Sequence, residues 1–176
     1  GGAGVPRANE EVVIAAQTAV EVLIDRNVVC SSLSIDASNG PARLIGSAEE
    51  RLRITGDLQL IGDVEWRYNG PVEFTASEGQ ARIDTRGVLI ASDVVIDGDA
   101  QWDLTSALNL ADDAALVIKH GTLRTNDGVL KLGSLRAEGH GSKRFEAGGS
   151  IILMKAFEPQ GFSGNVDQGS STLILN

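Results

Sequence analysis

Residues that carry redox and metal chemistry are scarce in this chain. Its 176 residues include one cysteine, Cys30, and two histidines, His120 and His140. A single cysteine excludes an internal disulfide and offers no Cys-x-x-Cys pair. Because Cys30 lies beside the apolar residues Leu33 and Ile35, we expect a buried, inert thiol instead of a reactive one. The two histidines are expected in turns and make a poor case for zinc.

Basic charge and long apolar runs are also scarce. Lys and Arg number 15 against 24 Asp and Glu, which gives a formal net charge of −9. This balance argues against nucleic acid and anionic membrane surfaces as partners, since both require clustered Lys and Arg. No apolar run approaches the length of a membrane span. We therefore expect neither nucleic-acid binding nor membrane insertion.

Aromatic residues make up only 4% of the chain, whereas apolar residues of all kinds make up 42% and glycines number 21. This composition indicates a thin, regular core of Val, Ile and Leu with many tight turns. A length of 176 residues fits one domain whose core needs no disulfide support. We expect residues 11–176 to form that domain, residues 1–10 to be a leader or a cut site, and the whole to belong to a longer polypeptide.

Short apolar-x-apolar triplets are the most informative feature of the sequence. Period-two alternation over so few residues, interrupted by Gly, Asp, Asn or Ser, is typical of short half-buried strands. The clearest examples lie between Arg51 and Leu132, and they are Leu52-x-Ile54, Val64-x-Trp66, Val72-x-Phe74, Val94-x-Ile96, Trp102-x-Leu104, Leu108-x-Leu110, Leu116-x-Ile118 and Leu130-x-Leu132.

The middle residues of such triplets form columns with a nearly constant spacing. One column, with steps of 20, 22 and 22 residues, reads Arg53, Glu73, Val95 and Val117, and we extend it upstream to Ser34 and Val13. A second, with steps of 20, 22, 21 and 22 residues, reads Leu89, Asn109, Lys131, Ile152 and Ile174. A third, looser column runs through Leu58-x-Leu60, Ile83, Trp102-x-Leu104, Leu123 and Phe145.

A fixed period of 20–22 residues predicts stacked repeats. The predicted fold is all-β, a parallel β-helix (β-solenoid) with three short strands per turn and about seven turns. The stretch from Glu10 to Val22 has a passable helical composition, but its β-branched residues favour a strand.

Threonines also recur at a fixed step. Thr85, Thr105 and Thr125 are each 20 residues apart. Equivalent turn residues of a solenoid stack, so we predict a turn ladder in which these hydroxyl groups hydrogen-bond from turn to turn. An ice-binding or ligand surface is the alternative, but it requires long Thr-x-Thr ranks, which the sequence lacks.

Carboxylates cluster in the turn that contains Asp97 and Asp99. Carboxylates and carbonyl groups at turns suit Ca²⁺, which takes six to eight oxygen ligands, so these two residues are a calcium candidate. Polysaccharide cleavage at such a site is a second reading. The third is that these residues are ordinary solvent-facing turn residues.

Two further groups of apolar residues have two readings each. Trp66, Tyr68 and Trp102 could form a sugar-stacking platform, but the alternation of Trp66 with Val64 and of Trp102 with Leu104 favours an inward position for both indoles. In the columns, Val95 and Val117, and likewise Ile152 and Ile174, occupy predicted outward positions. Contiguous outward apolar residues mark a covered surface, so these four are self-association candidates; the alternative is that a sheet face simply tolerates them.

Several turn phrases resemble the secreted repeat regions of Bacteroidota cell-surface proteins. The phrases are Cys30–Ile35, Ile83–Gly87, Gln101–Leu104, Gly121–Asn126 and Ser170–Leu175. The resemblance implies a parallel β-helix within a large exported protein, often carried by type IX secretion and tied to the cell surface. The chain departs from these proteins in using Asp, Arg and Ala where they are richer in Asn and Thr, and it contains no C-terminal sorting domain.

We therefore expect a non-enzymatic, extracellular structural or adhesive module, a stiff rod whose partners are adjacent domains or further copies joined end to end into a filament. The alternative is a carbohydrate-binding or polysaccharide-cleaving β-helix with surface polysaccharide as its partner. Asp and Arg or Lys side chains converging in one groove would favour the alternative, whereas flat faces would favour the rod. No cofactor is expected apart from the candidate calcium.

Overall fold

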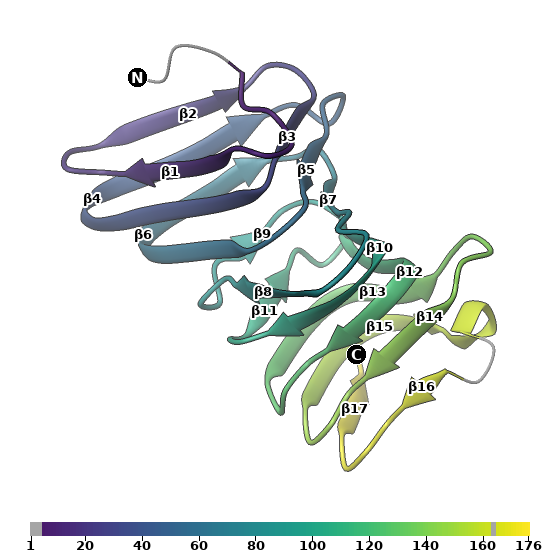
Figure 1. Cartoon of the computed structure of the whole chain (residues 1–176). Coiled ribbons are helices and arrows are strands. Elements are labelled where there is room, and N and C mark those ends of the chain that lie inside the picture. The colour runs from purple at the N-terminus through teal and green to yellow at the C-terminus, as the bar shows by residue number, and fades with distance from the viewer. Residues whose placement is uncertain (1–4, 163–164) are drawn as a thin grey trace.

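The computed structural model describes residues 5–162 and 165–176. The chain coils into an all-β parallel β-solenoid of about seven turns, as the repeat predicts (Figure 1). Strands of successive turns pair in parallel and form three columns, which we name A, B and C in the order in which the chain passes through them. Of the predicted leader, residues 1–4 lie outside the described part, and the first strand begins at Glu11.

Columns A and B contain most of the strands. Column A consists of β1 (Glu11–Ala15), the first parts of β4 (Ser32–Gly46) and β6 (Leu58–Tyr68), β8 (Gln80–Asp84), the second parts of β10 (Val94–Leu104) and β12 (Ala115–Arg124), β14 (Lys143–Glu146) and β16 (Val166–Asp167). Column B consists of β2 (Val20–Ile24), the second parts of β4 and β6, β9 (Leu89–Ile90), β11 (Leu108–Leu110), the first parts of β13 (Val129–Ala137) and β15 (Ile151–Glu158), and β17 (Thr172–Leu175).

Column C consists of β3 (Val28–Cys30), β5 (Leu52–Ile54), β7 (Val72–Phe74), the first parts of β10 and β12, and the second parts of β13 and β15. One short 3-10 helix, η1 (Pro159–Phe162), follows β15. Several strands therefore run without interruption from one column into the next.

The column that was read from Arg53 to Val117 is confirmed as column C. Arg53 pairs with Glu73, Glu73 with Val95, and Val95 with Val117. Its predicted upstream extension is wrong, because Val13 and Ser34 pair with each other in column A, and Val29 is the residue that precedes Arg53. The turns vary in length more than predicted, since the corners between strands absorb extra residues: Leu33 pairs with Leu58, whereas Val117 pairs with Arg136.

The second predicted column is wrong by one residue at Ile152. Lys131 pairs with Leu153, which pairs with Ile174, and Ile152 pairs with Leu130 in the core. Because side chains alternate between faces, this slip reverses the direction in which Ile152 points. The run Ile151–Met154 is apolar at every position, so alternation carries no information about its register.

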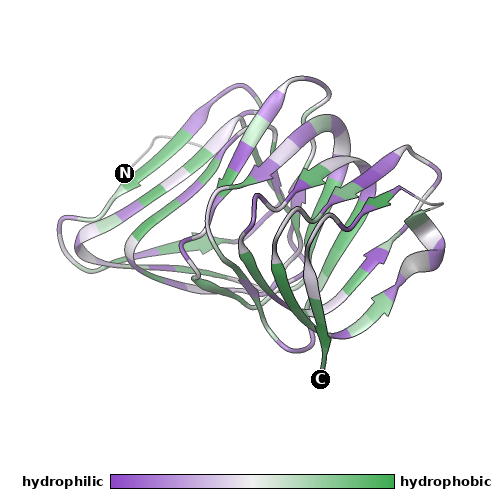
Figure 2. Cartoon of the chain, turned by 90° about the horizontal axis from the view of Figure 1, so that it is seen from below, coloured by the Kyte–Doolittle hydropathy of each residue, from purple (hydrophilic) through white to green (hydrophobic). Residues whose placement is uncertain are grey.

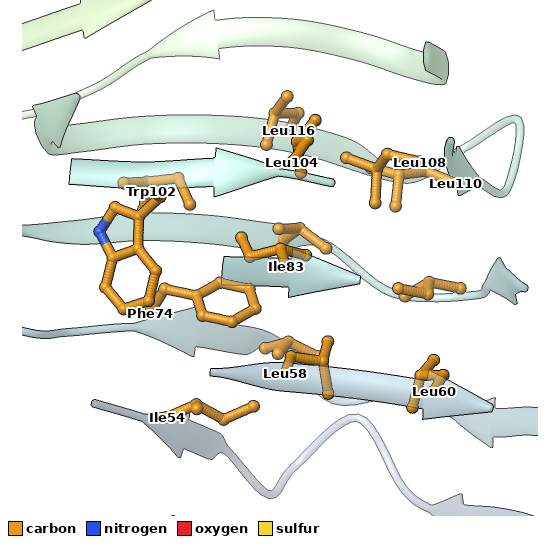
Figure 3. Packing of buried hydrophobic residues seen from close by; sticks show 14 of the residues in the cluster. Ile54, Leu58, Leu60, Phe74, Ile83, Trp102, Leu104, Leu108, Leu110 and Leu116 are labelled. Atoms are coloured by element: carbon orange, nitrogen blue, oxygen red, sulfur yellow. The ribbon is translucent and has the colours of Figure 1, made fainter. Parts of the chain in front are cut away.

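The core is a single apolar column enclosed by the three strand columns. Apolar and polar residues alternate along the strands (Figure 2), and the inward side chains of successive turns stack on one another (Figure 3). The ring centroids of Phe74 and Trp102 lie 5.0 Å apart in this stack. Trp66 and Trp102 are buried, as their alternation predicts, and Tyr68 is buried as well. These three rings are therefore not exposed for stacking on a sugar.

Candidate functional site

The calcium candidates Asp97 and Asp99 lie where β10 passes from column C to column A. Both are exposed. Asp97 is the ladder neighbour of His120, and Asp99 Oδ1 lies 2.7 Å from His120 Nε2. Within the described ranges, no group of three or more His, Cys, Asp or Glu is placed to hold a metal ion. The structure thus provides an acid–imidazole pair at this turn.

Other carboxylates of the same acidic region point to separate partners. Asp93 accepts a hydrogen bond from the Ala115 amide at 2.8 Å. Asp103 accepts one from the side-chain amide of Gln80. Asp112 lies 3.1 Å from Lys155 Nζ. Each carboxylate joins two turns of the coil, so the region strengthens the stacking of turns at several separate points.

The threonines form contacts between turns, but they do not form one vertical ladder. Thr85 donates a hydrogen bond to the Ala107 carbonyl oxygen at 2.6 Å, and Thr125 donates one to Ala147 at 2.8 Å. Both threonines are buried, whereas Thr105 is exposed. The ladder step in this part of column A is 21 residues, as in the pairs Ile83–Leu104 and Asp103–Arg124. A 20-residue spacing therefore shifts each threonine by one position from one turn to the next.

The four self-association candidates have different surroundings. Val95 and Val117 point outward as predicted, yet they are only 5% and 2% exposed and form a small cluster with Ala115. Arg136 follows Val117 in column C, and its Nη2 lies 3.7 Å from Asp93 Oδ2. Because Asp93 is two turns away and beside Ala115, the arginine side chain extends across this cluster.

The other two candidates lie on β15 and β17. Ile152 is 3% exposed and faces the core, which corrects its predicted outward position. Ile174 is 39% exposed and points outward beside Leu153. Of the four residues, only Ile174 presents its side chain to solvent.

Cys30 lies in the core, as expected. Burial raises the pKa of its thiol to about 11. Its sulfur lies 3.8 Å from the carbonyl oxygen of Arg53 on the next turn. At neutral pH the reactive thiolate is therefore a very small fraction of the total.

Cross-turn ion pairs are a feature that the sequence analysis missed. Arg43 Nε lies 2.6 Å from Glu65 Oε2, and Arg124 Nε lies 2.6 Å from Glu146 Oε2. In both pairs the residues are ladder neighbours. Opposite charges 22 residues apart were visible in the sequence, so the repeat period could have identified them.

A groove of about 740 Å³ runs along the start of column B. Three of its lining residues, Ala19, Pro41 and Asp63, precede equivalent positions of column B in the first three turns, and Val88 and Leu89 line it from the fourth turn. Its charged lining residues contact one another: Arg43 lies 3.5 Å from Glu21, and Arg67 lies 2.5 Å from Glu65. The remaining lining residues are Val20, Ala42, Val64 and Trp66.

This groove brings acidic and basic side chains from several turns together on a concave surface. The sequence analysis did not find it, because column B was not traced through the first three turns. Among the described residues, no helix combines the length and the apolarity needed to cross a membrane.

No protein-family model, no curated protein and no solved structure matches this chain.

Proposed function

We propose that this chain is a non-enzymatic structural module, a stiff solenoid that holds adjacent domains or further copies of itself at a set distance. The observation that carries the proposal is the in-register ladder of column C, which runs from β3 through every turn to β15. With a spacing of about 4.8 Å between turns, seven turns give a length of roughly 35 Å.

The paired charges on the outer faces support this role. Arg43, Arg124 and Glu73 each contact an oppositely charged side chain on a neighbouring turn. Each exposed pair contributes only about 0.2–1 kcal/mol. Their repetition along the coil nevertheless favours one stacking register over others, which suits a module whose purpose is geometric.

The proposed location is extracellular, at a cell surface. The turn phrases that resemble Bacteroidota surface repeats support this location, as does an acidic chain with a single buried cysteine. In such a setting the proposed partners are adjacent domains or copies stacked end to end. The parallel strands at either end would continue the same ladder.

Spin labels at two positions of column B test the stiffness. Leu89 and Ile174 are both exposed and outward, and they lie four turns apart in one column. In the double variant Leu89→Cys with Ile174→Cys, we expect a narrow distance distribution centred near 20 Å, since four turns span about 19 Å. A broad distribution in this pair would contradict the proposal of a stiff module.

Carbohydrate binding is a second candidate function, and the groove along column B favours it. Glu21, Arg43, Asp63, Glu65 and Arg67 bring acidic and basic groups together on its wall. Polysaccharides are recognised by such hydrogen-bonding groups in a concave site. A glycan array tests this function. Saturable binding that is lost in Arg43→Ala but kept in Arg124→Ala, which breaks a similar pair on column A, would support it.

A further inference from the structure

The ladder of column B is interrupted between the third and fourth turns. Between the second and third turns, β4 and β6 pair at five positions in column A and five in column B, and β5 and β7 pair at three in column C. Between the third and fourth turns, column A has two paired positions and column C has three. In the described residues no pairing joins β6 to β9 in column B.

The position of the interruption follows from the outward row of column B. Leu23 pairs with Ile45, and Ile45 pairs with Arg67. After the break the row resumes at Leu89, which pairs with Asn109. Arg67 and Leu89 are separated by 22 residues, the same step as from Ile45 to Arg67. These two residues would therefore be partners if the ladder continued.

Local structure explains why pairing fails here. β9 contains two residues, and it follows a corner in which Arg86 and Gly87 both have positive φ angles of 49° and 75°. In column A, by contrast, the Asp57 side chain bridges the same two turns, because the Arg82 amide donates a hydrogen bond to Asp57 Oδ1 at 2.8 Å.

A buried polar group lies on the column B side of the same level. The Trp66 indole N–H is buried there without a hydrogen-bond partner in the described part of the chain.

Column C stays continuous across the same level. Val72, Glu73 and Phe74 of β7 pair with the next turn at three consecutive positions. The Phe74 ring also contacts Trp102 in the core. Figure 1 shows the N-terminal turns displaced sideways from the C-terminal turns at this level. Columns A and C thus hold the two stacks of turns together, whereas column B does not pair at this level.

We propose that the solenoid is hinged between its third and fourth turns, with column C as the pivot and column B as the side that opens. The N-terminal stack comprises the first three turns, and the C-terminal stack comprises the rest. The groove has a wall on each stack, since residues 63–67 and residues 88–89 both line it. Its width therefore changes with the hinge angle. This inference goes beyond the proposed spacer function and confines the stiffness proposed there to each stack and to the continuous column C.

Matched pairs of spin labels test the hinge, with the distance between the two labels measured by pulsed electron–electron double resonance. Leu23→Cys with Asn109→Cys spans four turns and crosses the interruption, whereas Leu89→Cys with Ile174→Cys spans four turns within one stack. All four positions lie in the outward row of column B. The wild-type chain, whose Cys30 is buried, should take up no label. We expect the first pair to give a distribution at least twice as broad as the second.

A disulfide across the interruption provides the second arm. Neighbouring strands lie about 4.8 Å apart, within the range that a disulfide bridges. We expect Arg67→Cys with Leu89→Cys to form the bond under mild oxidation and to narrow the Leu23–Asn109 distribution to the width of the control. A disulfide between Ile45→Cys and Arg67→Cys is the control, because it joins two turns within the N-terminal stack. It should leave the Leu23–Asn109 distance distribution broad. Equal widths for the two label pairs before any disulfide forms would overturn the hinge, whatever the outcome for stiffness within one stack.

Discussion

Glu73 and Arg53 are ladder neighbours in column C, and their side chains form a close ion pair. Glu73 Oε2 lies 2.7 Å from Arg53 Nε, and Arg51 donates a hydrogen bond to the other carboxylate oxygen. Glu73 is only 5% exposed. Burial alone would raise the pKa of this carboxyl group, but hydrogen bonds from the two arginines, together with their charges, lower the pKa below its usual value.

This pair predicts acid-dependent stability. A carboxyl group whose pKa is lower in the folded state stabilises the fold above its unfolded pKa of about 4.3, and that contribution is lost as the pH falls through the folded value. At pH 7 we expect Glu73→Gln to reduce the free energy of unfolding by about 1–3 kcal/mol. In urea titrations the difference from wild type should shrink below about pH 4.

The exposed pair between Arg43 and Glu65 is the matched control. Glu65→Gln removes a carboxylate from a similar cross-turn pair, but its side chain is far more exposed. We expect a change within about 0.5 kcal/mol. Equal losses in both variants would show that burial does not distinguish the two carboxylates.

The contacts of Thr125 predict that Thr125→Val lowers the free energy of unfolding. The 20-residue spacing of the threonines alone would not predict this loss. Thr125 Oγ1 contacts the Ala147 carbonyl and lies 2.6 Å from Ser150 Oγ, and both hydroxyl-bearing residues are buried. Thr125→Val keeps the side-chain shape but leaves these groups without a partner, at a cost of about 1–3 kcal/mol. Thr105→Val, at an exposed position, should change stability by less than about 0.5 kcal/mol. Thermal unfolding of the two variants measures the difference.

The acidic turn at Asp97 and Asp99 predicts no response to calcium. Asp99 contacts His120, and Ca²⁺ needs six or more oxygen ligands. A ligand that binds only the folded state would raise the melting temperature. We expect the melting temperature to be the same with EDTA and with millimolar CaCl₂. A drop of several degrees in EDTA that calcium reverses and magnesium does not would establish a site here.

Of the candidate contact residues, Ile174 is exposed and Val117 is buried, so the same substitution should have different effects at the two positions. If copies associate through the outward face of β17, Ile174→Lys should lower the mass measured by light scattering toward that of one chain, with little loss of stability. Val117→Lys should instead destabilise the fold by several kcal/mol, because it buries a charge under Arg136. A single-chain mass for the wild type at high concentration, unchanged in Ile174→Lys, would contradict the contact.

The sequence by itself determined the fold class, the period and most of column C. Triplets such as Val72-x-Phe74 and Val94-x-Ile96 have one outward residue between two inward ones, so alternation and spacing together specify both face and partner. The same alternation of apolar residues predicted that Trp66, Trp102 and Cys30 are buried, which the structure confirms.

Tertiary structure decided the features that depend on other turns. The run around Ile152 is apolar at every position, so only its pairing with Leu130 shows which face it takes. Val95 and Val117 are buried beside Ala115, where Arg136 reaches Asp93 two turns away, a contact that no local pattern contains. The break between Arg67 and Leu89 keeps the regular 22-residue step, yet its hydrogen bonds are absent from the ladder of the described chain. Residue spacing sets which strands can stack, whereas the geometry of the intervening corner decides whether their backbones meet.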